Sequence, residues 1–119
     1  MTAANIIVNA RQISTKVGII DIQGEVSASA EKALMDAYAQ IGIASTRVII
    51  LNFTQMGYMN SSGIGLLVTL LIRVNRQKQH LQAYGLSEHY QQIFKLTRLS
   101  DVIHLYATEQ DALQVAHTL

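Results

Sequence analysis

The sequence predicts a single α/β domain, built on a mixed, mainly parallel sheet of four to five strands with about four helices. Three observations lead to this prediction. Two β-rich runs open the chain, short apolar runs alternate with stretches at helical spacing from residue 47 onward, and half of the 119 residues are hydrophobic. Such alternation implies parallel strands joined by helical crossovers, so residues 1–119 are expected to fold as one domain.

The chain begins with two predicted strands. Residues 6–13 and 16–23 are rich in β-branched side chains and are separated by a short polar turn, which favours an antiparallel pair. The second strand is expected to end at Gly24. Serines within residues 27–29 then offer capping hydroxyls ahead of apolar positions at helical spacing, which predicts a helix that ends at Gly42.

The alternating part of the chain supplies the remaining elements. Apolar runs bounded by polar residues or glycine indicate strands, and apolar residues three and four apart indicate helices. Residues 57–59, which follow the first strand of this part, are expected to form an apolar loop. The predicted elements are a strand over 47–53, a helix over 62–78, a strand over 81–84, a helix over 88–96, a strand over 103–106 and a helix over 109–117.

Composition limits the classes of partner and the compartment. Charged residues make up 14% of the chain and the net charge is +1, so no broad field is expected to attract nucleic acid or an anionic membrane surface. The chain has no cysteine, which excludes disulfides and thiolate sites and is typical of a cytoplasmic protein. Residues 1–5 carry no basic region followed by an apolar core, so no secretory signal is expected, and the longest apolar run, residues 64–72, is about half the length of a membrane span. A soluble protein without direct membrane insertion is expected.

The junction between the strand over 47–53 and the helix over 62–78 is the most informative segment. Ser61 and Ser62 lie where the helix begins, and Asn or Ser oxygens at that place accept hydrogen bonds from free backbone N–H groups. Capping needs only one such side chain, whereas Asn60, Ser61 and Ser62 follow one another beside an apolar segment. The residues therefore leave two interpretations open, a helix cap and a recognition surface.

Patterns for catalysis, nucleotide binding and metal binding are absent. A nucleophilic Ser61 would need a base, but G-x-S-x-G does not occur and the four histidines stand in no local motif. Residues 63–65 lack the third glycine of a dinucleotide fingerprint and the lysine of a P-loop, and no metal-ligand spacing recurs. The cations Arg73, Arg76 and Lys78 are explained by the dipole of the helix that ends there. We expect no enzyme, no catalytic residue, no metal and no cofactor.

A phosphate on Ser61 would affect the fold and a bound partner differently. It adds about −1.5 to −2 charges, and the helix N-terminus offers free N–H groups, so the fold should tolerate it. A partner packed over Met56, Tyr58 and Met59 would have to desolvate that charge without a counter-charge. A carboxylate about 6 Å away would add about 3 kcal/mol of repulsion per unit charge at an effective dielectric of about 20. Asn60 keeps a capping oxygen without that carboxylate.

At this junction the sequence resembles a known family. Residues 60–67, N-S-S-G-I-G-L-L after a strand, resemble the D-S-S-G-L-G signature of STAS domains, which include the anti-sigma-factor antagonists of bacterial partner switching and domains of sulphate transporters. Residues 24–27 look like the G-E-L-D turn of this family and residues 51–54 like its L-D-L-S strand end. The order of elements also fits. Ser27, Asn52 and Asn60 stand where the family usually has Asp, so three acids near the site are replaced by neutral residues.

The resemblance implies a regulatory switch. In the family, the unphosphorylated antagonist binds a serine kinase of the histidine-kinase-like ATPase class that is also the anti-sigma factor, and this binding releases the sigma factor. Phosphorylation, here at Ser61, ends the binding, and a metal-dependent serine phosphatase restores it. Asn60, Ser62 and Gly63 would support the phosphorylation site. The partner-binding surface would consist of Gly24, Glu25, Val26, Ser27, Met56, Tyr58, Met59 and Ile64.

Two other functions are compatible with the same resemblance. The chain could be a STAS subunit held constitutively on a membrane transporter ATPase, with the same surface in contact. It could also be a stressosome-like scaffold, although such scaffolds usually carry an additional N-terminal sensor domain or assemble into a shell, and we expect no second domain in these 119 residues. Nucleic acid is not expected as a partner under any of these functions.

Overall fold

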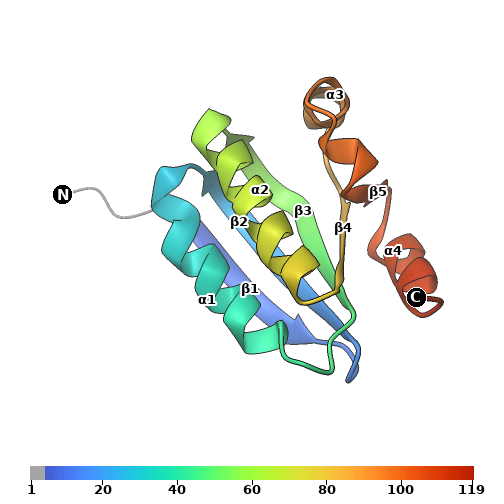
Figure 1. The fold of residues 1–119 in the computed structure, drawn as a ribbon. Helices are drawn as coiled ribbons and strands as arrows, with labels where there is room; N and C mark the ends of the chain where they lie inside the picture. Colours follow the sequence, from blue (N-terminus) through green and yellow to red (C-terminus); the bar gives the residue numbers. More distant parts are fainter. Residues whose placement is uncertain (1–4) are drawn as a thin grey trace.

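The computed structural model describes residues 5–119, which form a five-stranded sheet with helices on both faces (Figure 1). β1 is antiparallel to β2, and the other neighbouring strands are parallel. The strands follow one another across the sheet in chain order: β1 Ile6–Gln12, β2 Val17–Val26, β3 Val48–Met59, β4 His80–Tyr84 and β5 His104–Tyr106. The mixed, mainly parallel sheet with an N-terminal antiparallel pair is therefore confirmed.

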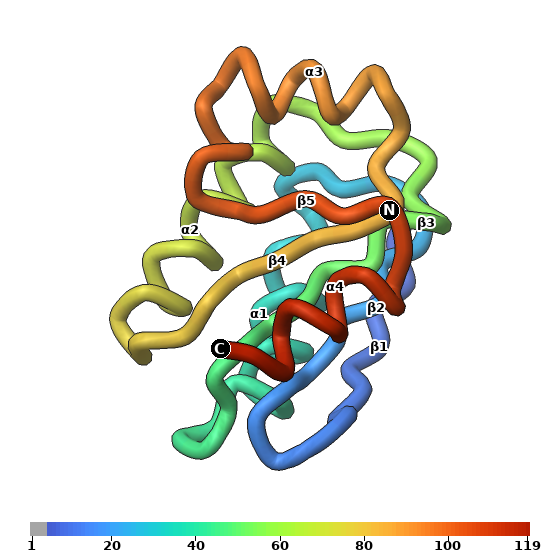
Figure 2. Tube along the Cα trace, turned by 90° about the vertical axis from the view of Figure 1, so that its right-hand side faces the viewer, coloured from blue at the N-terminus to red at the C-terminus, as the bar shows by residue number. Residues whose placement is uncertain are grey.

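Residues 5–119 also form four α-helices and two short 3-10 turns, of which α4 follows the last strand. α1 and α2 cover one face of the sheet, α4 covers the other, and α3 lies beyond the end of β4 (Figures 1 and 2). Their bounds are η1 Ala28–Ala30, α1 Glu31–Ile41, α2 Ser61–Arg76, α3 Glu88–Leu96, η2 Leu99–Asp101 and α4 Glu109–Ala116. None of these helices has the length and apolar character needed to cross a membrane.

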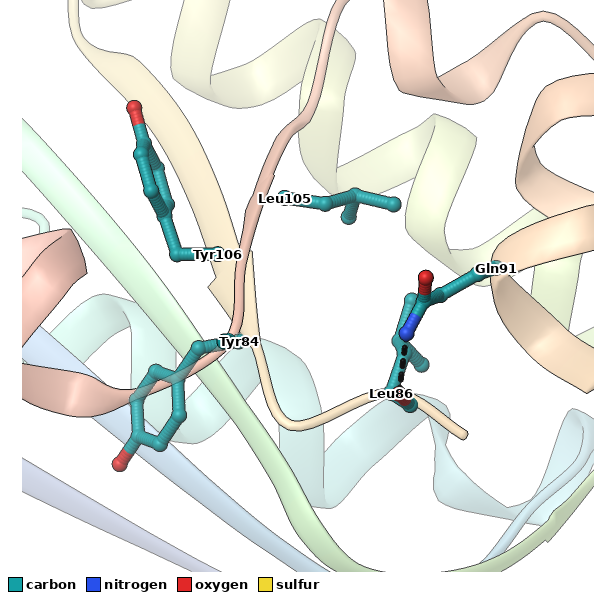
Figure 3. A pocket seen from close by; sticks show the side chains of 6 residues that line it. Tyr84, Leu86, Gln91, Leu105 and Tyr106 are labelled. Carbon is teal, nitrogen blue, oxygen red and sulfur yellow. Dashed lines mark hydrogen bonds between the residues drawn. The ribbon is translucent and has the colours of Figure 1, made fainter. Parts of the chain in front are cut away.

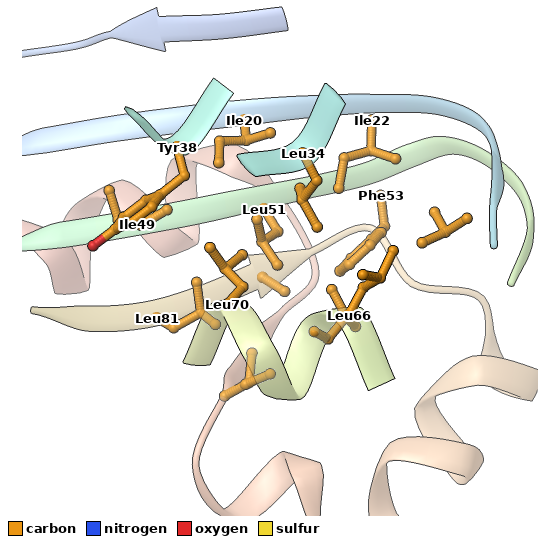
Figure 4. Packing of buried hydrophobic residues seen from close by; sticks show 14 of the residues in the cluster. Ile20, Ile22, Leu34, Tyr38, Ile49, Leu51, Phe53, Leu66, Leu70 and Leu81 are labelled. Carbon is orange, nitrogen blue, oxygen red and sulfur yellow. The ribbon is translucent and has the colours of Figure 1, made fainter. Parts of the chain in front are cut away.

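The two faces of the sheet carry separate apolar cores. Along β3, Ile49, Leu51 and Phe53 pack toward α1 and α2, whereas Val48 and Ile50 pack toward α4. This alternation follows from the two-residue period of a strand, and burial on both faces explains why this segment is almost entirely apolar. Figure 4 shows the larger core, where strand side chains meet those of α1 and α2. This packing holds α2 against the sheet.

The strands β2 and β3 extend further than the sequence predicted. Residues 24–26 pair with residues 56–59 in parallel, and Gly57 is the extra residue of a bulge between Met56 and Tyr58. The expectations that β2 ends at Gly24 and that residues 57–59 form a loop are wrong, because each segment supplies the hydrogen-bonding partner that the other lacks. The two extensions run beyond β4, which ends its pairing with β3 at Asn52.

The start of α1 also differs from the prediction, and its end agrees with it. A turn of 3-10 helix precedes α1, and Ser27 stands before that turn without capping any N–H group. Its hydroxyl lies 3.0 Å from the Ser29 hydroxyl instead. Gly42 is the C-cap of α1, as expected, and its N–H donates to the Tyr38 carbonyl. A Cβ on Gly42 would overlap the Tyr38 ring, so this position has no room for a side chain.

Candidate functional site

The candidate site is the junction at which β3 ends and α2 begins. Asn60 is the N-cap, with extended backbone, and its Oδ1 accepts a hydrogen bond of 2.9 Å from the Gly63 N–H. The Asn60 N–H donates to the Val26 carbonyl at 3.2 Å, which ties the junction to the end of β2. The cap is therefore provided by Asn60, and neither following serine is needed for it.

Ser61 and Ser62 form the exposed first turn of α2. In the described part of the chain, neither hydroxyl has a hydrogen-bonding partner. The backbone N–H groups of the first turn have no partner within the helix, and only that of Gly63 is taken by the cap side chain. Ser61 thus presents a free hydroxyl at the partially positive end of a 16-residue helix. Asn60 contacts the backbone of this turn, whereas the Ser62 side chain makes no hydrogen bond in the described residues, and the support of a phosphorylation site by either residue stays a prediction.

The two glycines of this turn have different surroundings. A Cβ on Gly63 would lie 2.2 Å from the Val26 carbonyl oxygen and 2.8 Å from Met59 Cγ, so only glycine allows α2 to start this close to β2. A Cβ on Gly65 would have no neighbour within 4 Å. Gly63 is therefore required by packing, while Gly65 leaves the exposed surface flat one turn beyond Ser61.

The residues predicted for a partner surface separate into exposed and buried groups. Glu25 and Tyr58 are exposed and stand next to each other across β2 and β3, and 51% of Tyr58 is accessible. Val26 and Met59 are 1% and 4% exposed and belong to the core. The expectation that their side chains form surface is corrected, because the alternation along both strands turns them inward. The remaining predicted residues, Gly24, Ser27, Met56 and Ile64, are partly accessible.

A residue of α3 that sequence reasoning missed also holds the junction. The Tyr90 hydroxyl accepts a hydrogen bond of 2.9 Å from the Met59 N–H, one residue before the cap. This N–H lies beyond the end of β4, where no further strand can pair with β3. Tyr90 is 31 residues from Met59 in the chain, and no local sequence pattern predicts a contact over this separation.

The segments that meet at Ser61 carry acids and no lysine or arginine. Residues 24–31, 56–66 and 84–91 contain Glu25, Glu31 and Glu88, with His89 as the sole basic side chain of these segments. A phosphate on Ser61 would therefore meet backbone N–H groups but no arginine or lysine from these segments.

Asn52 does not belong to this junction, contrary to the sequence-based expectation. It lies on the sheet face that α4 covers, where its Nδ2 donates to Asp21 at 2.8 Å. Asn52 is seven strand residues before Met59, roughly 20 Å at the rise of a β-strand. The loss of an acid at this position therefore changes a network on the opposite face.

That network links four strands to the first turn of α4. Arg11 binds both Asp21 oxygens, at 2.6 and 2.8 Å, and Glu109 at 2.7 Å, and the Tyr84 hydroxyl donates to Glu109 at 2.8 Å. Partial burial would raise the pKa of Asp21, but the hydrogen bonds from Arg11 and Asn52 lower it below its ordinary value. Hydrogen bonds from Arg11 and Tyr84 lower the pKa of Glu109. The network holds α4 on the sheet.

A small cavity lies between β4, β5 and α3 (Figure 3). Its volume is about 160 Å³, and Gln91 turns toward the Leu86 carbonyl, to which its Nε2 donates at 2.8 Å. Its lining offers no acid, histidine or other ready catalytic group: Tyr84, Leu86, Gln91, Leu105, Tyr106 and Ala107. Within residues 5–119 there is also no cluster of three or more His, Cys, Asp or Glu that could hold a metal ion.

Comparison with known families decides the relationship that the motif suggested. The STAS domain model matches residues 9–112, which includes β2, the whole junction and the first half of α4. The chain belongs to the STAS domain family. Two curated relatives are named anti-sigma-B factor antagonists. That of Listeria monocytogenes is 26% identical over 105 residues, covering 88% of this chain and 92% of the relative. That of Staphylococcus aureus is 28% identical over 86 residues, covering 72% and 80%.

Solved structures agree with the STAS fold. An anti-sigma factor antagonist from Mycobacterium paratuberculosis has a TM-score of 0.80 at 18% identity, covering 98% of this chain and 99% of that chain. The anti-sigma factor antagonist SpoIIAA in its unphosphorylated form has a TM-score of 0.70 at 18% identity, covering 95% and 100%. A sulfate transporter family protein from Wolinella succinogenes has a TM-score of 0.73 at 17% identity, covering 91% and 90%. At these identities the structures establish the fold, which both antagonists and transporter domains share.

Proposed function

We propose that this STAS domain is an anti-sigma-factor antagonist that is switched by phosphorylation of Ser61. Its unphosphorylated form binds an anti-sigma factor that is also a serine kinase of the histidine-kinase-like ATPase class, and this releases the sigma factor. The phosphorylated form does not bind, and a metal-dependent serine phosphatase resets it. In this proposal the protein acts in the cytoplasm by binding, not as an enzyme, and ATP belongs to the kinase.

The observation that carries the proposal is the free hydroxyl of Ser61. Asn60 provides the cap, so Ser61 can be modified without loss of a hydrogen bond that stabilises the fold. Its neighbours in the first turn offer N–H groups to a phosphate. No histidine or carboxylate in the described residues hydrogen-bonds to Ser61, which favours a modified residue over a nucleophile. The two curated relatives named above support the choice of an anti-sigma-factor partner.

Charge explains how the switch would release its partner. Residues 24–31, 56–66 and 84–91 hold Glu25, Glu31 and Glu88 and no lysine or arginine, and the exposed Lys32 directly follows Glu31. A phosphate on Ser61 adds about −1.5 to −2 charges, which no lysine or arginine within those segments offsets. A partner over Tyr58 and Ser61 would have to desolvate that charge, which costs several kcal/mol unless the partner brings a cation.

The test is affinity capture from the native bacterial extract with four forms of the protein. Wild type, Ser61→Ala and Ser61→Asn should capture an ATPase of the histidine-kinase-like class, while Ser61→Asp should lose it by about tenfold or more. Ser61→Asn matches Ser61→Asp in size, so a difference between these two variants is caused by charge. The mass of the native protein should show one phosphoryl group that Ser61→Ala lacks.

Two results would contradict the switch. Equal capture by Ser61→Asn and Ser61→Asp would show that charge at this position does not control binding. Capture of a transporter ATPase by all four forms, without a phosphorylated species in the native protein, would instead assign the domain to a constitutive transporter complex.

A further inference from the structure

We infer that the end of the molecule opposite Ser61 is a docking face for an anionic lipid surface. This basic face consists of Lys16, Arg47, Arg73, Arg76 and Lys78, together with His80. These residues come from the β1–β2 turn, the start of β3, the end of α2 and the start of β4. All six are exposed, and none forms an ion pair within residues 5–119.

Backbone hydrogen bonds place part of the basic face in one row. The Arg47 N–H donates to the Lys16 carbonyl at 2.7 Å, and the His80 N–H donates to the Arg47 carbonyl at 2.8 Å. Lys16, Arg47 and His80 therefore stand side by side where three adjacent parallel strands begin. These strands begin at the same end of the sheet, and α2 ends there (Figure 1). The cations carried by these segments therefore share one end of the domain.

The net charge of the chain does not reveal the positive charge of this end. Residues 13–18, 41–48 and 72–80, which form this end, contain five of the nine lysines and arginines and no acid. The rest of the chain holds the other four cations and all eight acids, a formal charge of −4. The sequence-based argument that a net charge of +1 gives no field for an anionic surface is therefore corrected, because the charges are segregated along the molecule.

Helix capping does not account for the basic face. Cations favour the C-terminus of a helix, which explains Arg73 and Arg76, but Lys16 and Arg47 belong to strand ends. Lys78 has a φ of 59°, in the left-handed region where glycine is favoured and other residues are strained. Lys78 therefore stands at a position where helix termination alone would favour glycine, as does Arg98 elsewhere in the chain.

The same end has a groove suited to a phosphate headgroup. It lies between the C-terminal ends of α1 and α2, has a volume of about 420 Å³, and is lined by Arg73, Arg76 and Gln77 from α2 and its cap. Gly42, Ala39 and Tyr38 form the opposite wall. Guanidinium groups bind phosphate oxygens in a bidentate manner, so two arginines on one wall match such a group.

Exposed isoleucines favour a lipid surface over a soluble polyanion. Ile13, Ile43 and Ile72 are 38%, 49% and 47% exposed, and all three lie among the segments that form the basic face. A membrane interface accepts apolar side chains beside cations, whereas a nucleic acid backbone does not bury them. An anionic lipid surface is therefore the partner that both the cations and the exposed isoleucines can bind.

Docking at this face would leave the Ser61 junction accessible. The 16 residues of α2 separate the two ends by about 24 Å at the rise of an α-helix. The junction would point away from the lipid, so docking neither needs nor blocks phosphorylation. This inference does not depend on the proposed function of Ser61.

The test is sedimentation of the full chain with vesicles of phosphatidylcholine alone or mixed with phosphatidylserine. Binding should require phosphatidylserine and fall as salt is added. Each cation near an anionic surface contributes about fivefold in affinity, so the double variant Arg47→Gln, Arg76→Gln should bind about 30-fold more weakly. The double variant Lys32→Gln, Lys95→Gln is the control. It removes the same charge elsewhere and should lose about threefold or less.

A second variant tests the apolar part of the basic face. Replacing Ile43 and Ile72 by Ser leaves the charge unchanged and should lower vesicle binding by about fivefold. Thermal unfolding of each variant confirms that it is folded. Equal losses in the two charge variants, or equal binding to vesicles without phosphatidylserine, would overturn the inference. So would tighter binding to soluble polyglutamate or duplex DNA than to the mixed vesicles.

Discussion

Replacing Gly63 by Ala should destabilise the fold, whereas replacing Gly65 by Ala, two residues further along α2, should stabilise it. A Cβ on Gly63 would lie 2.2 Å from the Val26 carbonyl oxygen and 2.9 Å from its carbon, so β2 or α2 has to move by about 1 Å. Overpacking of this kind costs about 1–3 kcal/mol, while glycine to alanine within a helix gains about 0.5–1 kcal/mol. The net effect at Gly63 is a loss of about 1–2 kcal/mol.

At Gly65 the overpacking cost is absent, and only the stability gained by replacing glycine with alanine in a helix remains. No atom lies within 4 Å of its Cβ position, so Ala should raise the free energy of unfolding by about 0.5–1 kcal/mol. The two variants should therefore differ by about 2–3 kcal/mol although they make the same chemical change in the same helix. For a domain of this size the difference corresponds to about 10 °C in Tm.

Urea unfolding followed by circular dichroism measures both effects. The slope with urea should be unchanged in both variants, because neither changes the surface exposed on unfolding. A Gly63→Ala variant as stable as wild type would refute the close approach of α2 to β2 at the junction. A loss of stability in Gly65→Ala would refute the open surroundings of that position.

Three further predictions concern polar contacts on the two faces of the sheet. Asn60→Ala should lower stability by about 1 kcal/mol in urea unfolding, because the Gly63 N–H loses its cap, while Asn60→Asp should retain it. Tyr90→Phe should cost about 1 kcal/mol and speed amide exchange at Met59, whose N–H loses its acceptor; unchanged exchange would contradict the contact. The pKa values of Asp21 and Glu109 are lowered in the folded state, so their contribution to stability is complete above about pH 5 and is lost as the pH falls below about 4. The variant Asp21→Asn, Glu109→Gln should therefore show a flatter stability profile between about pH 5 and 3 than wild type.

The order and type of the elements could be predicted from local pattern. α3 over Glu88–Leu96 has the predicted bounds, and α2 and α4 differ from prediction by one or two residues. Each of these helices buries one face, so its apolar residues recur three and four positions apart, and this spacing can be recognised in the sequence alone. The ends of β2 and β3 were not predicted. In the sequence alone, Gly24, Glu25 and Gly57 are typical of a strand end, and only the pairing of the two strands continues both strands through these residues.

The candidate site could be predicted in part. Asn60, Ser61, Ser62 and Gly63 are consecutive, so the motif at the helix start was visible, and the structure adds that Asn60 alone is the cap. Which neighbouring side chains face solvent was not visible. Val26 and Met59 looked like surface from their place in the motif, but their strands turn them into the core.

By itself the sequence determined the α/β class, the antiparallel start, the succession of helices and the serine at the head of α2. These features depend on residues close together in the chain, whose spacing fixes the local conformation. Only the tertiary structure placed Tyr90 on the end of β3, moved Asn52 to the opposite face, and gathered Lys16, Arg47 and Arg76 at one end of the molecule. Contacts and fields of this kind arise from strand pairing and packing between distant segments, because a local sequence pattern does not specify which distant residues will be neighbours.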